Sequence, residues 1–222
     1  MTPDRNKLTE RLSQFTHHEY TGGTPAAVAL LVTEEGHGSG LPGLPDYSKW
    51  NAAGALLVTQ RARHLKRHAG QWALPGGRVD AQETLMQAAI RETREEINID
   101  LSSDDYIGRL DDYVTHSGFV MSGLVFWAGP AHSATASPDE VESIHRIPFT
   151  ELQRDDAPLL SHNELEHPLT DKVSSHPVLR MPVSDDWIAA PTAAFLYQFR
   201  EVCLRNKHTR VAHFEQPAFA WK

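Results

Sequence analysis

The sequence contains very little cysteine and no long hydrophobic stretch. Cys203 is the only cysteine among 222 residues, so neither an intramolecular disulfide nor a four-cysteine zinc site can form. No run approaches the roughly 18 apolar residues that a membrane-spanning helix needs. The first residues, MTPDRNKLTERLSQ, lack the apolar core of a signal peptide. We therefore expect a cytoplasmic protein that has no membrane partner.

An excess of positive charge is also missing. The chain has 21 Lys and Arg against 29 Asp and Glu, which gives a net charge of −8 at pH 7. This balance argues against a general nucleic-acid binder, although a local basic patch can still hold phosphates. The composition is otherwise ordinary for a globular protein, with 40% hydrophobic residues. We predict a single domain over residues 1–222, and the sequence leaves a homodimer open.

The order of the predicted elements indicates an α/β fold. Apolar runs and alternating patterns predict strands, whereas helical spacing of apolar residues predicts helices. The strands are expected at 25–32, 53–62 and 141–147, with two more in 111–129 that break near Ser117 and Gly118. The helices are expected at about 3–15, at 82–97 and from Pro191 onward. This order is typical of an α/β/α sandwich with a mixed sheet.

The remaining segments are predicted as loops or additions. Residues 34–50 are rich in Gly and Pro and indicate a long loop, and residues 155–187 are predicted to have irregular structure. We expect a core over about 24–155, with a C-terminal extension over about 156–222 that adds a helix and a tail. In this helix Cys203 is a packing residue, and Phe219 and Trp221 are expected to hold the tail down.

The predicted helix at 82–97 carries an unusual group of acidic residues. At about 100° per residue, Glu92, Glu95 and Glu96 fall within roughly a third of the helix circumference. Like charges at these spacings repel and weaken an isolated helix. A divalent cation would remove the repulsion, and Mg²⁺ or Mn²⁺ prefers carboxylate oxygens. Partial compensation by Arg91 and Arg94 is the alternative.

A glycine turn directly before this helix strengthens the metal hypothesis. Gly76 and Gly77 follow Pro75 and permit tight or left-handed backbone. Such backbone lets a carbonyl oxygen approach a ligand closely. A carbonyl beside three glutamates would complete an all-oxygen site for Mg²⁺ or Mn²⁺.

The whole stretch resembles the signature of the Nudix hydrolases. Gly77 is followed after five residues by Glu83, and after seven more by Arg91-Glu92, Thr93, an arginine, Glu95-Glu96, an isoleucine and Asn98. Two positions depart from the Nudix box, which has an aliphatic residue at Thr93 and a glycine at Asn98. Thr93 can still pack with its methyl group, and Asn tolerates the left-handed conformation best after Gly.

The resemblance implies a fold, an activity and roles for particular residues. It implies the Nudix-type α/β/α sandwich and hydrolysis of the diphosphate bridge in a nucleoside diphosphate derivative, a small-molecule nucleotide substrate, with Mg²⁺ or Mn²⁺. The Gly76 carbonyl, Glu92, Glu95 and Glu96 resemble the metal ligands, Arg91 resembles the residue that braces them, and Glu83 resembles the carboxylate at the helix start. A downstream glutamate often serves as base or extra ligand, and Glu140 and Glu142 are the candidates.

The residues before the box are similar to one Nudix subfamily, the coenzyme A diphosphatases. In LLVTQRARHLKRHAGQWALPGG, Thr59, Arg61 and Pro75-Gly76-Gly77 agree with that signature, whereas Lys66 stands for an arginine and Leu74 for a phenylalanine. The resemblance implies cleavage of coenzyme A or acyl-coenzyme A to 4′-phosphopantetheine and adenosine 3′,5′-bisphosphate. The expected substrate-binding residues are Arg61, Lys66, Arg67 and Gly77.

Two alternatives stay open. The substrate could instead be ADP-ribose, NADH or a nucleoside triphosphate, because the box does not specify the nucleotide. A catalytically silent ligand sensor of the same fold would be expected to have lost box carboxylates, and Glu92, Glu95 and Glu96 are all present.

Overall fold

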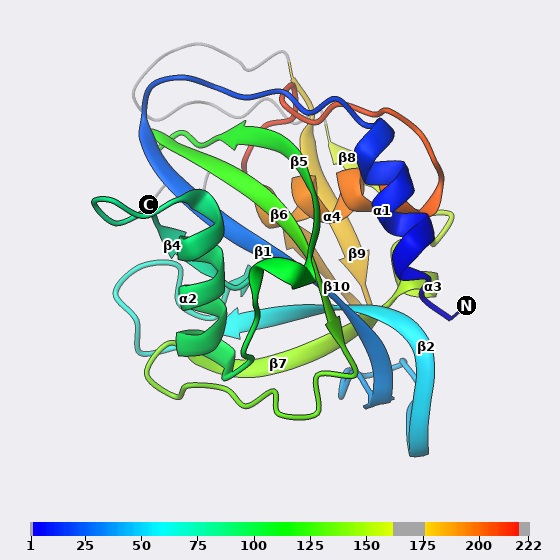
Figure 1. Ribbon diagram of the computed structural model, residues 1–222. Helices are drawn as coiled ribbons and strands as arrows, with labels where there is room; N and C mark the ends of the chain where they lie inside the picture. Colours follow the sequence, from blue (N-terminus) through cyan, green and yellow to red (C-terminus); the bar gives the residue numbers. More distant parts are fainter. Residues whose placement is uncertain (1, 162–175, 218–222) are drawn as a thin grey trace.

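A mixed seven-stranded sheet lies at the centre of the computed structural model, which describes residues 2–161 and 176–217 (Figure 1). The strand order is β3-β2-β1-β6-β5, with β4 beside β1 and β7 beside β2. β1 and β6 are parallel, and the other pairs are antiparallel. The strands are β1 (Thr24–Gly38), β2 (Asp46–Arg61), β3 (Trp72–Ala73), β4 (Gly76–Arg78), β5 (Tyr106–Val114), β6 (Phe119–Gly129) and β7 (Val141–Pro148).

Helices cover both faces of this sheet. The helical segments are α1 (Arg5–Gln14), α2 (Leu85–Ile97), η1 (Ser103–Asp105), α3 (Phe149–Leu152), α4 (Thr192–Phe199) and the π-helical η2 (Arg200–Leu204), which continues α4. Side chains of β1 alternate between the two faces: Ala27, Ala29 and Leu31 pack with α2, whereas Val28, Leu30 and Val32 pack with α1, α3 and α4. This layering confirms the predicted α/β/α sandwich.

The segment predicted as irregular, 155–187, contains a second sheet, so that prediction was wrong. Antiparallel strands β8 (Leu159–Ser161), β9 (Val178–Val183) and β10 (Asp186–Ala189) form it in the order β10-β9-β8. Leu179 and Met181 of β9 are fully buried in the core shared with α4. Pro182 within VLRMPV masks the strand pattern, because proline seldom occurs inside strands. Residues 162–175 lie outside the described part of the chain.

The prediction of a long loop at 34–50 was also wrong. β1 extends to Gly38 and β2 begins at Asp46, so only residues 39–45 connect them. Polar cross-strand pairs stabilise the extension: the Tyr47 hydroxyl donates to Glu35 at 2.7 Å, and the Trp50 indole N–H donates to Glu34. Glycines at positions 36 and 38 hid these strands, because glycine weakens a strand pattern.

The terminal helices form where the sequence predicts them. Asp4 caps α1 by accepting from the Lys7 amide at 3.2 Å, and Leu8 and Leu12 bury its apolar face. Cys203 is fully buried beyond α4, and burial raises the pKa of its thiol, which confirms a packing role. The anchoring expected of Phe219 and Trp221 falls outside the described residues.

Candidate active site

Helix α2 has well-defined ends that fix its orientation on the sheet. Thr84 and Gln87 form a capping box in which the Thr84 side chain accepts from the Gln87 amide at 3.2 Å. Asn98 ends the helix in the left-handed conformation with φ 56°, as its place in the box predicts. Thr93 is fully buried and donates to the Ala89 carbonyl at 2.7 Å, so it packs in place of the expected aliphatic residue.

Two glycines of β4 bring the backbone close to this helix. A Cβ atom on Gly76, which has φ 153°, would lie 2.3 Å from the carbonyl oxygen of Ala27 in β1. A Cβ atom on Gly77 would lie 2.3 Å from the carboxylate Oε1 of Glu92. Both distances are far below van der Waals contact. Gly76 therefore permits the strand pairing, and Gly77 leaves room for the Glu92 carboxylate.

Arg91 connects three carboxylates. Its Nε donates to Glu83 at 2.8 Å, and its Nη1 donates to Glu92 at 2.8 Å and to Glu95 at 3.1 Å. Its Nη2 donates to Glu83 at 3.0 Å and to the Arg78 carbonyl at 3.2 Å. These bonds raise the pKa of Arg91 and lower that of Glu83. The guanidinium therefore has the contacts that the bracing role requires.

Carboxylates from two distant segments meet at the inner side of α2. Oxygens of Glu92, Glu96 and Glu140 all lie within 4.8 Å of one another. Glu140 precedes β7, and its carbonyl accepts from the Ala62 amide at 2.9 Å. The Ser137 amide donates to the Glu96 carbonyl at 2.8 Å, which ties the same segment to the helix. Three hard oxygen donors are therefore held together by backbone contacts.

This cluster is electrostatically unfavourable when it carries full charge. Glu96 is only 4% exposed, and burial, followed by the charges of Glu92 and Glu140, raises its pKa to about 8. Arg61 and a backbone hydrogen bond from Gly76 oppose the rise. Burial also raises the pKa of Glu92, against the effect of Arg91. Three carboxylates crowded around the buried Glu96 suit a divalent metal ion, whose charge offsets their repulsion, so the donor set fits Mg²⁺ or Mn²⁺.

Two predicted acidic residues lie apart from this cluster. The side chain of Glu95 is 58% exposed on the outer flank of α2, where it pairs with Arg91. Glu142 is exposed on β7 and is not part of the cluster of three. Glu140 is thus the downstream candidate that the fold brings to the helix. The metal-ligand roles of Glu95 and of the Gly76 carbonyl stay predictions.

Among the predicted substrate-binding side chains, Arg61 is near enough to the acidic cluster for its charge to lower the pKa of Glu96. It ends β2, and its amide donates to the Gln71 carbonyl at 2.9 Å. Its Nε is buried and has no hydrogen-bond partner within residues 2–161 and 176–217. Lys66 and Arg67 are exposed in the loop after β2 and do not line the pocket that Arg61 lines. Their substrate-binding role stays a prediction.

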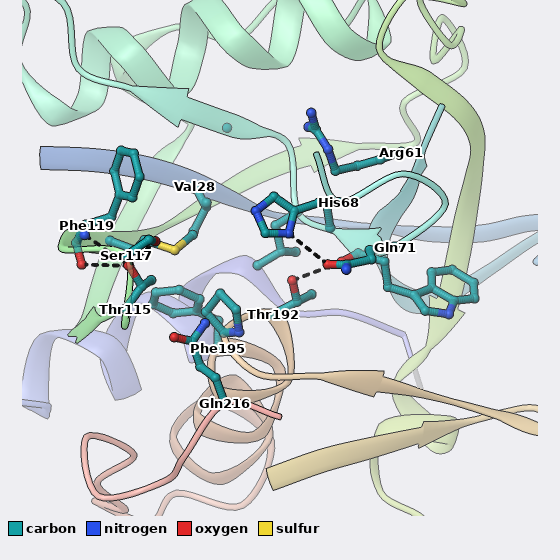
Figure 2. A pocket seen from close by; sticks show the side chains of 16 residues that line it. Val28, Arg61, His68, Gln71, Thr115, Ser117, Phe119, Thr192, Phe195 and Gln216 are labelled. Carbon is teal, nitrogen blue, oxygen red and sulfur yellow. Dashed lines mark hydrogen bonds between the residues drawn. The ribbon is translucent and has the colours of Figure 1, made fainter. Parts of the chain in front are cut away.

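A pocket of about 210 Å³ opens beside Arg61 and Gly76 (Figure 2). Ser117 and Phe119 lie at the end opposite Arg61, and Phe195 of α4 lines the side between them. Sequence reasoning missed this pocket. Ser117 bonds the Thr115 hydroxyl at 3.0 Å in the turn between β5 and β6.

The helices of the described residues include none that is long and apolar enough to cross a membrane.

Sequence comparison finds relatives over the central part of the chain. A protein from Citrobacter koseri named "Uncharacterized Nudix hydrolase NudL" is 41% identical over 100 residues, which cover 45% of this chain and 52% of that protein. The protein of the same name from Salmonella newport is 40% identical over 97 residues, covering 43% and 50%. The chain thus spans about half the length of the curated relatives it matches.

Two solved structures resemble this chain in the arrangement of their helices and strands. The MutT protein from Methanosarcina mazei is 19% identical, with a TM-score of 0.42, over 62% of this chain and 83% of that one. A MutT/nudix family protein from Enterococcus faecalis is 17% identical, with a TM-score of 0.45, over 83% and 57%. The profile of the NUDIX domain matches residues 49–167, more than half of the sequence and the whole of the acidic helix. The chain therefore belongs to the NUDIX family.

Proposed function

We propose that this protein hydrolyses the diphosphate bridge of a nucleoside diphosphate derivative in a metal-dependent reaction. The observation that carries the proposal is the cluster of Glu92, Glu96 and Glu140 beside the Arg61-lined pocket. A diphosphate needs cations on both sides of its bridging oxygen, and the combination of bound metal and arginine supplies them.

Glu92, Glu96 and Glu140 would hold the metal, joined by Glu95 and the Gly76 carbonyl as the Nudix resemblance implies. When bound, a divalent ion stabilises the charge that develops on the phosphoryl oxygens and lowers the pKa of water. The protein's own residues position the reaction. Arg91 fixes the Glu92 carboxylate at 2.8 Å and so orients one of the metal-binding side chains. Arg61 binds a phosphate oxygen.

The proposed substrate is coenzyme A or acyl-coenzyme A. Support comes from the signature that contains Thr59, Arg61 and Pro75-Gly76-Gly77, and from the basic residues of the loop that follows β2. Coenzyme A carries a 3′-phosphate in addition to its diphosphate, and Lys66 and Arg67 offer exposed positive charge for it. This substrate also agrees with a cytoplasmic location. We further propose that residues 1–222 act as one domain, because one apolar core joins α1, the sheet and α4.

A substrate panel with product identification tests the reaction. Coenzyme A, dephospho-coenzyme A, ADP-ribose, NADH and nucleoside triphosphates are compared at equal concentration with Mg²⁺ and with Mn²⁺. We expect 4′-phosphopantetheine and adenosine 3′,5′-bisphosphate from coenzyme A, with ¹⁸O from labelled water in a phosphate group. Release of free thiol from acyl-coenzyme A would show a thioesterase. Faster cleavage of ADP-ribose than of coenzyme A would leave only the general diphosphatase.

A further inference from the structure

The pocket beside Arg61 is lined by uncharged groups over most of its wall. None of its described lining residues is acidic, and Arg61 is its only arginine or lysine. Hydroxyl groups of Ser117 and Thr192 and the amide side chains of Gln71 and Gln216 alternate with apolar and aromatic surface. Such a wall binds an uncharged group that has its own amides or hydroxyls, whereas burying a second phosphate there would leave its charge unpaired.

The C-terminal part of the chain builds one side of this pocket. The Thr192 hydroxyl at the start of α4 donates to the Trp72 carbonyl at 3.3 Å. The amide of His116 donates to the Gln216 side chain at 2.8 Å. The Tyr113 hydroxyl donates to the Phe214 carbonyl at 2.9 Å, which fixes the same segment to β5. These contacts fix a part of the pocket wall that comes from outside residues 49–167, the range that the NUDIX profile matches.

A second cavity adjoins the pocket at Trp72. This cavity of about 160 Å³ shares Gln71, Trp72, Pro191 and Thr192 with the pocket, and Trp187 and Ala189 of β10 line the far side. The two spaces together reach the range of about 300–1,000 Å³ that is typical of small-molecule sites. Because they follow one another, they suit an elongated group better than a compact one.

Positive charge is concentrated in the loop that follows β2, outside the pocket wall. Arg63, Lys66 and Arg67 are all exposed in the loop after β2, and none of them lines the pocket. A substrate with a phosphate-rich half and an uncharged half would therefore meet an uncharged wall inside the pocket and exposed positive charge outside it.

We infer that this pocket receives the uncharged, amide-containing arm of the substrate, while the phosphorylated nucleoside lies toward the exposed basic loop. The inference rests on the proposed function, since it assumes a diphosphate held between Arg61 and the acidic cluster. It makes residues of the C-terminal extension, Thr192 and Gln216, determinants of substrate selectivity.

The test measures binding of the two products of coenzyme A cleavage separately. The variant is Ser117→Trp, which places a large ring at the end of the pocket opposite Arg61. Ser117 is exposed, so folding should tolerate the change. The matched control is Val114→Trp, a 48% exposed position in the same hairpin that does not line the pocket. Calorimetry gives the Kd of 4′-phosphopantetheine and of adenosine 3′,5′-bisphosphate for wild type and both variants.

We expect Ser117→Trp to weaken 4′-phosphopantetheine binding at least tenfold and to change bisphosphate binding less than twofold, with Val114→Trp like wild type. Equal effects on both products, a larger effect on the bisphosphate, or no binding of 4′-phosphopantetheine to wild type would overturn the inference. Hydrolysis of coenzyme A by wild type is measured independently. If it occurs while Ser117→Trp leaves both Kd values unchanged, the inference fails and the proposed function stands. If it is absent but the selective loss of binding is seen, the pocket assignment stands and the proposed reaction fails.

Discussion

Alanine substitutions at Gly76 and Gly77 should differ in their effect on stability, although the two residues are neighbours. The obstacle at Gly76 is backbone: a Cβ atom would lie 2.3 Å from the Ala27 carbonyl oxygen and 2.7 Å from the Val28 Cα. The obstacle at Gly77 is the far end of a side chain, the Glu92 carboxylate, whose Oε1 would be 2.3 Å away. Backbone inside a sheet cannot move independently, whereas a carboxylate can rotate.

Gly76→Ala should therefore lower stability. The new methyl group must separate β4 from β1, and φ 153° at this position is strained for alanine. Lost strand pairing and backbone strain together should cost about 2–4 kcal/mol. We expect a lower urea midpoint together with lower activity.

Gly77→Ala should leave stability nearly unchanged and lower kcat. Ordinary contact for a Cβ atom begins near 3.4 Å, so the Glu92 carboxylate must retreat by about 1 Å. A displacement of that size at a reacting centre can cost about a hundredfold in rate. The urea midpoint should stay close to wild type, while the Kd for Mn²⁺, measured by calorimetry, rises.

Comparing the two variants tests whether backbone is the obstacle at Gly76 and a side chain the obstacle at Gly77. Urea denaturation followed by circular dichroism, kcat at saturating metal and Mn²⁺ titration are measured on both. If Gly77→Ala retains wild-type kcat and Mn²⁺ affinity, Glu92 is not held where the reaction needs it. If Gly77→Ala unfolds as readily as Gly76→Ala, the distinction between side-chain and backbone obstacles is wrong.

Three other changes test the same site. In EDTA, wild type should lose stability as pH rises from 4.5 toward 8, because the folded state raises the pKa of Glu96 to about 8 and binds its proton more tightly than the unfolded state. Glu96→Gln should flatten the dependence of the urea midpoint on pH. Glu95→Gln should keep the wild-type dependence, because the Glu95 side chain is 58% exposed. An identical dependence in all three proteins would refute the argument from burial. With metal present, Glu96→Gln should lower kcat at least about a hundredfold. Arg91→Lys should lower kcat about tenfold and reduce the melting temperature, because lysine cannot form the five hydrogen bonds that the planar guanidinium donates. Unchanged kcat and melting temperature would show that Arg91 is not needed to hold the carboxylates. Arg61→Ala should raise KM for coenzyme A and for dephospho-coenzyme A alike, by about tenfold or more, because Arg61 is placed at the diphosphate. A loss confined to coenzyme A would assign Arg61 to the 3′-phosphate and contradict this placement.

The parts of the site that could be predicted from sequence are those that depend on local geometry. Glu92 and Glu96 are four positions apart on one helix, so their proximity follows from helical spacing. Asn98 has the left-handed conformation that its place at the helix end requires. The fold class could be predicted for a similar reason, since strand and helix periods are properties of short windows.

The parts that escaped prediction depend on contacts between distant segments. Glu140 and Glu142 could not be distinguished, because only the loop that bonds Ala62 and Glu96 selects Glu140. For Glu95, helical spacing alone is not enough to place the side chain. The spacing groups it with Glu92 and Glu96, but in the structure it pairs with Arg91 on the outer flank of α2. Residues 34–50 and 178–183 were misjudged because glycine and proline obscured strands that tertiary pairing supports.

The proposed chemistry and the proposed selectivity therefore have different structural origins in this chain. Two of the three clustered carboxylates, Glu92 and Glu96, lie on one helix, and the Ser137–Glu96 backbone bond ties the segment of Glu140 to that helix. The pocket wall depends on Thr192 and Gln216, which reach the site only because α4 and the C-terminal segment pack across the sheet. A substitution that loosens this packing should raise KM for one substrate and spare the metal-binding residues. Under the proposed function, substrate preference can thus change without any change in the acidic cluster, and for this reason the Nudix signature leaves the substrate open.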